Sequence, residues 1–303
     1  MKIVAIVVTY NRKELLIQCI NALLTQSRVP EKILIVNNAS TDETLDYLQY
    51  RELDTHSTID ILTLPENIGG AGGFSAGLKY VLDHGADYIW MMDDDATPHS
   101  NALENLIRHT TPDCIYASLA VQDEQISWEM TVKEKNNWKV THNPKDISQI
   151  MEVYCLPFLG FMIHRNIVEK IGLPDEGFFI TADDTEYCLR AKNQGYKLYL
   201  IGDSLIEHPK AHHQKYKILG KTINYVSLPA WKRYYDTRNR IFISKKYFGL
   251  RLYSQTLPSL FFRFILTMIH DENKLKQLKA YFFGCYDGLM SRNGKRHENK
   301  GLQ

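Results

Sequence analysis

The chain has 303 residues, of which 44% are hydrophobic and 23% charged, values ordinary for a globular protein. The formal net charge of +1 conceals an uneven distribution. Residues 209–303 carry 19 Lys and Arg against 5 Asp and Glu, a net charge of +14, so the first 208 residues carry −13. A basic, aromatic end fits an anionic membrane surface or a pyrophosphate ligand, with a solvated basic surface as the alternative, and no nucleic-acid partner is predicted.

The cysteines and the apolar runs indicate the cellular compartment in which the protein is expected. The five cysteines are scattered and form no CxxC pair, which argues against a disulfide framework or a zinc site and favours a reducing cytoplasm. The N-terminus has a strand pattern and no signal peptide, and no stretch reaches the roughly 18 apolar residues of a membrane span. The apolar segment 257–269 contains Arg263 and is short, so it can lie in a membrane interface without crossing it.

Strands and helices alternate in the first hundred residues. The β-branched run 3–9 predicts a buried parallel strand, and the apolar spacing after it predicts a helix. The pattern β-α-β-α-β-α-β predicts a mostly parallel sheet with ligands at the carboxyl ends of its strands. The predicted elements are strands 3–9, 32–36, 59–64 and 88–93, helices 13–26, 44–50 and 75–84, and a glycine loop at 67–74.

The later pattern is less regular. Residues 113–151 are polar and mixed, and predict irregular strands or an insertion. A strand is predicted at 153–164, a helix from Asp183 through Ala191, and short strands at 198–201 and 204–207. After Pro209 the chain is basic, aromatic and mostly helical. We therefore expect two domains, 1–208 and 209–303.

Three consecutive carboxylates, Asp93, Asp94 and Asp95, end the fourth predicted strand. Adjacent acids repel one another unless a cation or dense hydrogen bonding compensates. Side chains alternate along a strand, so Asp93 and Asp95 are expected on one face and Asp94 on the other. Paired carboxylates suit Mg²⁺ or Mn²⁺, and a solvated acidic turn is the alternative.

Other polar groups follow the strands. Thr9, Asn37, Asn38 and Asp42 can read a uracil edge and a ribose, although the stretch 37–42 is also a good turn and helix cap. The glycine-rich loop fits neither a dinucleotide fingerprint nor a P-loop, but allows close approach of a ligand. Further on, Asp183 and Asp184 begin a helix, and His208 follows a strand.

Four ordered motifs give this sequence a resemblance. VVTYNR at 7–12, NASTD at 38–42, the three aspartates and DDTEY at 183–187 resemble the inverting family-2 glycosyltransferases, an α/β class with the Rossmann-like GT-A fold. The glycine stretch and the later histidine look most like bacterial galactofuranosyltransferases, with rhamnosyltransferases close by. The resemblance implies that Asp93, Asp95 and His208 bind the metal. It makes Asp184 the catalytic base, with Asp183 beside it. The donor pocket would include Thr9, Arg12, Asn38, Asp42, Asn67, Gly69, Gly70, Gly72, Gly73, Asp93 and Asp94.

The implied activity is transfer of galactofuranose from UDP-galactofuranose to a hydroxyl of a lipid-linked or oligosaccharide acceptor in cell-surface polysaccharide synthesis. The first alternative is a rhamnosyltransferase using dTDP-rhamnose. The second is a non-catalytic carbohydrate-binding or assembly subunit. A sugar-nucleotide pyrophosphorylase lacks support because its glycine-rich basic loop is missing. The family often has Asp where this chain has Asn37, which leaves the readout of the base open.

The implied location is the cytoplasmic side of the bacterial plasma membrane, as a peripheral protein. Two basic aromatic segments, 231–240 and 280–295, are expected to dock on anionic lipid. The alternative for this surface is contact with a second copy in a homo-oligomer. The QxxRW motif of processive synthases is absent, so addition of one or a few sugars is expected.

Overall fold

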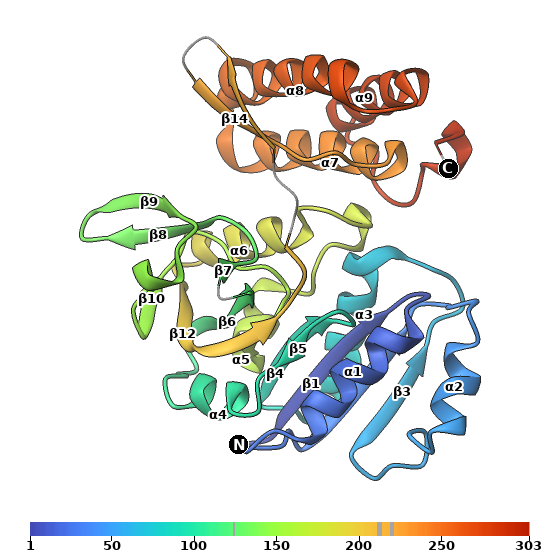
Figure 1. Ribbon diagram of the computed structural model, residues 1–303, viewed down its shortest axis with the longest axis vertical. Coiled ribbons are helices and arrows are strands. Elements are labelled where there is room, and N and C mark those ends of the chain that lie inside the picture. The colour runs from blue at the N-terminus through green and yellow to red at the C-terminus, as the bar shows by residue number, and fades with distance from the viewer. Residues whose placement is uncertain (124, 211–213, 219–220, 303) are drawn as a thin grey trace. The chain divides into compact units, whose positions relative to one another are not determined.

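The computed structural model describes residues 1–123, 125–210, 214–218 and 221–302. Its contacts divide the chain into two compact units (Figure 1). Unit 1 comprises Met1–Asp175 and Tyr187–Lys210, and unit 2 comprises Glu176–Glu186 and Ala211–Gln303. The predicted domains 1–208 and 209–303 stay a prediction. The units add one feature, because the segment 176–186 groups with the C-terminal region.

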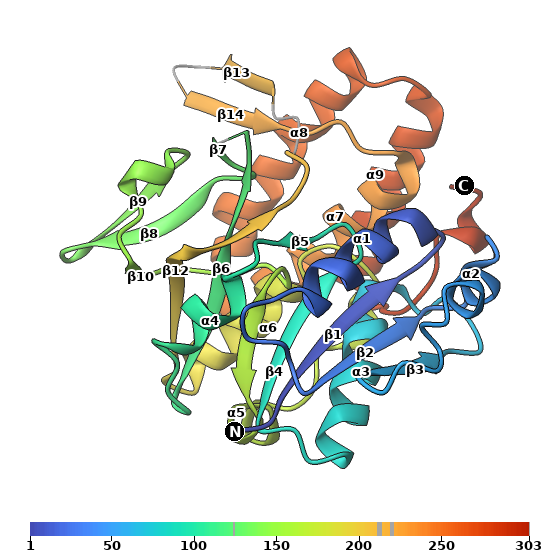
Figure 2. The same cartoon turned by 60° about the horizontal axis from the view of Figure 1, so that its bottom comes forward.

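Within the described residues, a ten-stranded sheet forms the centre of unit 1 (Figures 1 and 2). Its strands are β1 (Ile3–Thr9), β2 (Lys32–Asn37), β3 (Ile59–Thr63), β4 (Tyr88–Asp93), β5 (Thr97–Pro98), β6 (Cys114–Gln122), β7 (Gln125–Ile126), β10 (Ile150–Glu152), β11 (Phe161–His164) and β12 (Lys197–Glu207). The order is β10-β12-β6-β11-β4-β1-β2-β3. β1 to β4 pair in parallel, as do β6 and β12, whereas β11 is antiparallel to both β4 and β6. The predicted mixed, mostly parallel sheet is confirmed.

Alternate residues of the strands belong to two hydrophobic clusters, one on each face of the sheet. Val4, Ile6 and Val8 of β1 belong to one cluster, while Ile3, Ala5 and Val7 belong to the other. This two-sided burial explains why β1 is apolar throughout. The first cluster includes residues of α3 (Gly69–Asp83), α5 (Arg165–Ile171) and α6 (Asp183–Asn193); the second includes residues of α1 (Lys13–Leu24), α2 (Thr44–Tyr50) and α4 (Ala102–Ile107).

The predicted glycine loop at 67–74 is wrong, because α3 begins at Gly69. A Cβ added at Gly73 would lie 2.6 Å from Val8 Cγ1, and one at Gly77 would lie 2.9 Å from Ile6 Cγ2. These glycines lower helix propensity, yet they let α3 pack closely on β1. Close packing against the sheet outweighs local propensity here.

The region after Asp113 departs most from the sequence prediction. Residues 114–122 form β6, a strand inside the sheet, where irregular strands or an insertion were expected. The strand predicted at 153–164 shrinks to Phe161–His164, and Gly160 precedes it with φ of +65°. The two short strands predicted at 198–207 are one strand, β12, with a register shift between Ile201 and Leu205.

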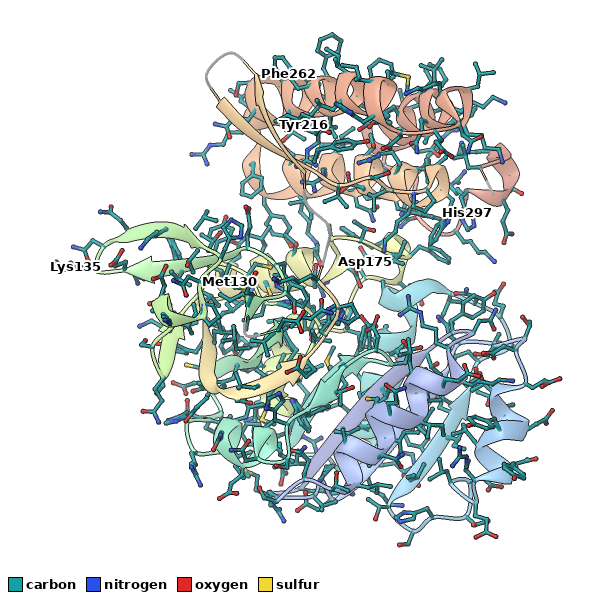
Figure 3. The ribbon with its side chains drawn as sticks, in the orientation of Figure 1. Met130, Lys135, Asp175, Tyr216, Phe262 and His297 are labelled. Carbon is teal, nitrogen blue, oxygen red and sulfur yellow. The ribbon has the colours of Figure 1, made fainter. Side chains whose placement is uncertain are left out.

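A hairpin of β8 (Met130–Glu134) and β9 (Asn137–Thr141) lies beside this sheet, with Lys135 at its tip (Figure 3). Short 3-10 turns are η1 (Pro144–Asp146) in unit 1, and η2 (Glu176–Phe178) and η5 (Glu298–Lys300) in unit 2.

Unit 2 is mostly helical, as predicted. It contains the hairpin β13 (Gln214–Ile218) and β14 (Lys221–Tyr225), the helices α7 (Ala230–Ile243), α8 (Leu257–His270) and α9 (Lys274–Leu289), and the π-helical turns η3 (Ser244–Phe248) and η4 (Leu252–Thr256). Tyr216 of the hairpin, labelled in Figure 3, stacks on His270 with ring centroids 4.3 Å apart. Gly284 and Gly288 of α9 face α7, where an added Cβ would lie 2.8 Å from Thr237 Cβ and 2.9 Å from Ile241 Cβ.

The predicted surface role of residues 231–240 is wrong for most of that segment. Arg233, Arg238 and Asn239 of α7 have no exposed surface, and Tyr234 and Tyr235 are equally buried. These basic and aromatic side chains form the interior of unit 2. In the part of the chain that the structure describes, no helix has both the length and the apolar character needed to cross a membrane.

Candidate active site

Polar side chains meet where β1 and β4 end side by side, since Val8 pairs with Asp93. The Thr9 hydroxyl donates to Asp94 Oδ2 at 2.7 Å, and both residues are buried. Arg12, just before α1, donates through Nη1 to Asp94 Oδ1 at 3.2 Å and to Asp95 Oδ2 at 2.7 Å. Two adjacent carboxylates are therefore held together by one guanidinium and one hydroxyl.

These two carboxylates differ in acidity. Burial raises the pKa of Asp94 to about 6, although Thr9 and Arg12 act in the opposite direction. Burial alone would also raise the pKa of Asp95, but His208 and Arg12 outweigh it and hold that pKa below its ordinary value. Asp95 is therefore the more strongly ionised member of the pair.

The prediction that Asp93 and Asp95 share one strand face, with Asp94 on the opposite face, is wrong. β4 ends at Asp93 and the chain turns, so strand alternation does not reach Asp95. Asp94 and Asp95 instead converge on Arg12. The role of Asp93 as a metal ligand stays a prediction.

His208 comes from the end of β12 and faces Asp95. Its Nε2 lies 3.4 Å from Asp95 Oδ1, beyond the usual hydrogen-bond range. That buried oxygen has no hydrogen-bond partner in the described structure, and neither does His208 Nδ1. Ser127 Oγ donates to the His208 carbonyl at 2.8 Å, and the Trp128 ring meets the imidazole edge-on at 5.2 Å, so the histidine is fixed in place.

This pair fits a divalent cation. Two ligands of one octahedral Mg²⁺, each about 2.1 Å from it, stand roughly 3 Å apart, close to the observed separation. A carboxylate oxygen without a hydrogen-bond partner suits such an ion, and the imidazole nitrogen beside it can serve as one further ligand. Across the described residues, no group of three or more His, Cys, Asp or Glu side chains is placed to hold a metal. Asp95 and His208 would therefore need further ligands, such as donor phosphates.

The predicted donor-pocket residues of the next loop hold backbone. Asp42 accepts from Lys13 N at 3.3 Å, at the start of α1, and from the Thr44 hydroxyl, at the start of α2. Asn38 is buried and donates to Gly69 O at 3.0 Å. Its Oδ1 accepts from Ile68 N at 3.0 Å. These bonds tie the loop after β2 to the starts of α1, α2 and α3, and contact of these residues with a nucleotide stays a prediction.

The glycine segment starts α3 at the same end of the sheet. Asn67 Oδ1 accepts from Gly69 N at 2.9 Å, and Gly69 has φ of +78°. A Cβ at Gly72 would collide with Ile68, whereas one at Gly70 would meet nothing within 4 Å. Gly70 is thus the position where space remains for a ligand.

Asp183 and Asp184 lie in unit 2, at the first turn of α6. Burial and the Asp184 carboxylate raise the pKa of Asp183 to about 7, although Lys232 acts in the opposite direction. Burial also raises the pKa of Asp184, although its Oδ1 accepts from the Thr185 hydroxyl at 3.2 Å. The pair is thus more basic than ordinary aspartates, as proton acceptors need to be.

Two contributors to this site were missed from the sequence. Asn11 has φ of +56° and accepts from Thr41 N at 2.6 Å, joining the loops after β1 and β2. Its signal was available, because Asn is enriched at positive φ. Trp128 packs on His208 from far along the chain, and no local pattern marks it.

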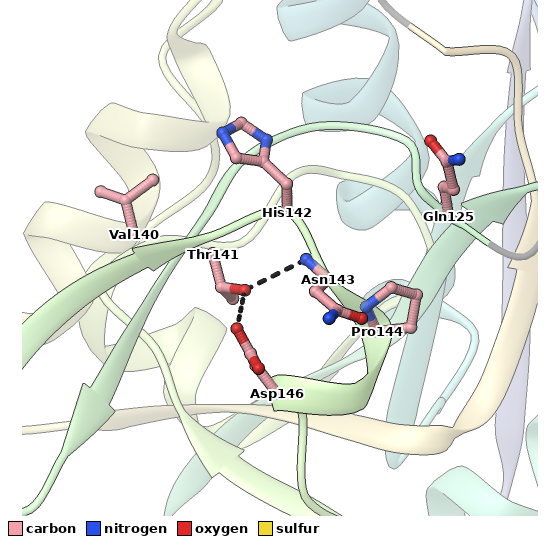
Figure 4. Close-up of a pocket in the computed structure, with 7 residues that line it drawn as sticks. All are labelled: Gln125, Val140, Thr141, His142, Asn143, Pro144 and Asp146. Atoms are coloured by element: carbon pink, nitrogen blue, oxygen red, sulfur yellow. Dashed lines mark hydrogen bonds between the residues drawn. The ribbon is translucent and has the colours of Figure 1, made fainter.

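A hollow of unit 1 lies at the end of β9, away from the carboxylate cluster in sequence, as Figure 4 shows. Thr141 Oγ1 donates to Asp146 Oδ2 at 2.6 Å and accepts from Asn143 N at 3.1 Å (Figure 4). These groups satisfy one another, so this hollow is a weaker candidate than the carboxylate cluster. Its lining residues are Gln125, Val140, Thr141, His142, Asn143, Pro144 and Asp146.

Comparison with known proteins shows the family of this chain. The family described as "Glycosyl transferase family 2" matches residues 4–172, more than half of the chain. The galactofuranosyltransferase GlfT1 of Mycolicibacterium smegmatis is 27% identical over 278 residues, covering 86% of this chain and 87% of the relative. The dTDP-rhamnosyl transferase RfbF of Shigella flexneri is 24% identical over 300 residues, covering 96% and 97%.

Solved structures agree in fold. The crystal structure of GalNAc-T7 with UDP, GalNAc and Mn²⁺ superimposes with a TM-score of 0.60 at 13% identity. It covers 96% of this chain, which spans only 58% of that protein. Staphylococcus aureus TarS residues 1–349 with UDP-GlcNAc gives 0.57 at 16% identity, covering 96% of this chain and 82% of that one. At these identities the likeness establishes the GT-A fold alone.

Proposed function

The chain belongs to glycosyltransferase family 2, and we propose that it transfers galactofuranose from UDP-galactofuranose, with inversion, to a hydroxyl of a lipid-linked or oligosaccharide acceptor. One observation carries the proposal. An unpartnered buried oxygen of Asp95 faces His208 where parallel strands end, beside a guanidinium that holds Asp94. Membership of an enzyme family argues against the non-catalytic assembly subunit.

The proposed chemistry assigns one task to each group. Asp95 and His208, with Asp93 as a further predicted ligand, would hold Mn²⁺ or Mg²⁺, which offsets the negative charge on the departing diphosphate. Thr9 and Arg12 fix Asp94 beside this site. Donor contacts are assigned to the start of α3, where Gly70 leaves open space.

Asp184 is the proposed general base. It takes the proton of the acceptor hydroxyl as that oxygen bonds to the anomeric carbon. The bond from this carbon to the diphosphate oxygen breaks, and its electron pair leaves with UDP. Attack from the face opposite the leaving group inverts the configuration in one displacement. The raised pKa of Asp184 supports this role, because a more basic carboxylate accepts a proton more readily.

The donor sugar is the least constrained part. The relative GlfT1 is named a galactofuranosyltransferase, and this name is the reason for proposing UDP-galactofuranose as the donor. The relative RfbF, named a dTDP-rhamnosyl transferase, matches over more of the chain at lower identity and keeps dTDP-rhamnose as the second candidate. Asn37 accepts from Ser40 N at 3.0 Å, and its amide retains capacity to bind either pyrimidine.

A donor panel tests this proposal. Release of UDP or dTDP from each nucleotide sugar is measured with Mn²⁺ and again with EDTA. Mn²⁺-dependent release from UDP-galactofuranose is expected. Preference for dTDP-rhamnose would keep the mechanism and replace the donor, whereas no binding of any nucleotide would contradict the transferase proposal.

We also propose that α9 docks on an anionic lipid surface. Its exposed apolar residues recur every three or four positions, so they lie on one face of the helix. They are Leu275, Leu278, Phe282, Tyr286 and Leu289. Exposed Lys274, Lys276 and Lys279 fall on the flanks of this stripe. Apolar side chains between lysines match a membrane interface with negative headgroups.

Vesicle flotation checks the docking surface. The protein is expected to float with phosphatidylglycerol vesicles at low salt and to sediment with phosphatidylcholine alone. Phe282→Ser should abolish flotation, while Tyr50→Ser, which removes a side chain 81% exposed in unit 1, should not. Dimerisation through α9 without flotation would favour the homo-oligomer instead.

A further inference from the structure

The segment before the proposed base follows an unusual backbone path. Phe179, Thr181 and Ala182 all have φ between +64° and +72°. Non-glycine residues rarely adopt this left-handed conformation, because their Cβ lies too close to the neighbouring carbonyl oxygen. Three of them within four residues persist only if surrounding groups hold them. Asp183 and Asp184 follow immediately.

Asn239 supplies one part of that restraint. Its Nδ2 donates to the carbonyls of Phe178 at 3.0 Å, Ile180 at 2.9 Å and Thr181 at 2.8 Å. One fully buried amide therefore meets three carbonyls of the same short segment. Carbonyls that point together in this way would repel one another without a donor between them.

Arg238 supplies the second part. Its Nη2 donates to Gly177 O at 2.8 Å and to Phe178 O at 2.9 Å, and its Nη1 donates to Gly294 O at 2.7 Å. Its Nε donates to Asn239 Oδ1 at 2.9 Å, which turns the amide nitrogen of Asn239 toward the carbonyls. The guanidinium also lies 4.7 Å from the centre of the Tyr235 ring, and Tyr235 stacks on Phe179.

No carboxylate of the described residues forms an ion pair with Arg238, although this cation has no exposed surface. Burying a charge is costly, and here backbone carbonyls supply the direct contacts, with a longer-range contribution from the Asp287 carboxylate. Burial lowers the pKa of Arg238, as expected for a cation in such surroundings. The guanidinium is thus committed to backbone positions.

The other side of the acidic pair is also anchored. Glu186 is fully buried, and its Oε1 accepts from the Tyr247 hydroxyl at 2.6 Å and from Lys246 Nζ at 2.8 Å. Asp183 and Asp184 therefore lie between two fixed points of unit 2. Between them, the direction of the Asp184 side chain follows from the backbone path.

We propose that Arg238 and Asn239 are positioning residues for the base Asp184, and that their hydrogen bonds to residues 177–181 set its orientation. This inference rests on the proposed function of Asp184. Arg238 and Asn239 act through the backbone and touch no reacting atom.

Arg233 provides a matched control. It lies on the same helix, α7, and is equally buried. Its Nη2 donates to Val226 O at 2.6 Å and lies 3.3 Å from Asp271 Oδ2, away from the segment 177–186. A variant at Arg233 therefore perturbs the same core without releasing the segment before the base.

The test compares Asn239→Ala, Arg238→Lys and Arg233→Lys. Each variant is measured for melting temperature, UDP affinity, kcat for UDP release from its donor, and amide hydrogen exchange in residues 176–186. We expect Asn239→Ala and Arg238→Lys to exchange faster there and to lose about 10- to 100-fold in kcat, since small misplacements of a catalytic group have such effects. Their UDP affinity should stay within about twofold. Arg233→Lys should lower the melting temperature while kcat and exchange of this segment change little.

Some outcomes would overturn the inference. These are a kcat of Asn239→Ala close to that of the wild type, or an equal kcat loss in Arg233→Lys at matched loss of melting temperature. If the wild type releases nucleotide from no donor, the proposed function fails, and exchange alone then decides whether the two residues hold the segment. Faster exchange in Asn239→Ala and Arg238→Lys would support that restraint, and unchanged exchange would refute it. If Arg238→Lys does not fold, the same comparison stands on Asn239→Ala.

Discussion

The two units of this protein have interiors of opposite kinds. In unit 1, two apolar clusters enclose a sheet whose β1 strand is buried at every position. In unit 2, the central helix α7 buries Arg233, Asp236, Arg238 and Asn239 alongside its tyrosines. An apolar core tolerates small changes, because each contact contributes little by itself. A core that buries charged groups is strongly destabilised when the partner of one such group is removed.

The largest expected effect is catalytic and concerns unit 2. Asp184→Asn should lower the rate of UDP release by about 10²- to 10⁴-fold, because an amide cannot accept the proton. UDP affinity should remain nearly unchanged, since the proposed donor site is built by unit 1. Single-turnover kinetics and calorimetric UDP binding measure the two effects. Retention of more than about a tenth of the wild-type rate would remove Asp184 as the base.

The next effect contrasts the two cores directly. Arg233→Met leaves the buried Asp271 carboxylate without its cation and should cost about 3–5 kcal/mol in the free energy of unfolding. The double variant Arg233→Met with Asp271→Leu should recover much of that loss, because no unpaired charge remains. Urea unfolding followed by tryptophan fluorescence, to which Trp231 of α7 contributes, measures both. A double variant as unstable as the single one would show that packing, not charge, dominates.

A smaller effect depends on pH. The pKa of Asp183 is raised to about 7 by burial and by Asp184, against about 3.9 in an unfolded chain. The folded protein thus binds the proton more tightly, and this carboxylate lowers stability progressively as pH rises from about 4 to 7. Asp183→Asn removes this charge, so it should raise the melting temperature at pH 8 but not at pH 4. Equal shifts at both pH values would contradict the raised pKa.

The smallest effect belongs to the apolar core. Ile6→Val removes one methyl group from a fully buried side chain of unit 1 and should cost about 0.5–1.5 kcal/mol. Activity should be unchanged. Chemical denaturation of this variant gives the reference for Arg233→Met, and a loss as large as in that variant would erase the contrast between the two interiors.

The difference between the two interiors also explains why the sequence predicted unit 1 better than unit 2. The run Ile3–Thr9 has one interpretation, because a strand covered on both faces is apolar throughout. Arg233 and Arg238 look like surface cations, since a sequence does not show that Asp271 or the carbonyl of Gly177 lies against them. The docking role given to residues 231–240 failed on this ambiguity.

The candidate site was predictable in composition but not in arrangement. The aspartates and His208 follow strand ends and were noticed from that position, whereas Arg12 was identified only through the family resemblance. The turn after Asp93, which brings Asp94 and Asp95 onto Arg12, depends on tertiary packing and leaves no signal in a run of identical residues. The glycines of α3 were interpreted as a loop because the residues that require them, Val8 and Ile6, belong to the strand β1 against which the helix packs.

Those glycines influence where the residues of the candidate site lie. The missing methyl group of Gly73 lets α3 lie against Val8, and the next residue along β1 is Thr9, whose hydroxyl holds Asp94. Because neighbouring side chains on a strand point to opposite faces, the depth of the helix on one face sets the height of the hydroxyl on the other. The position of the Asp94 carboxylate thus depends on how closely α3 packs on the opposite face of the sheet, which the absence of a Cβ at Gly73 allows.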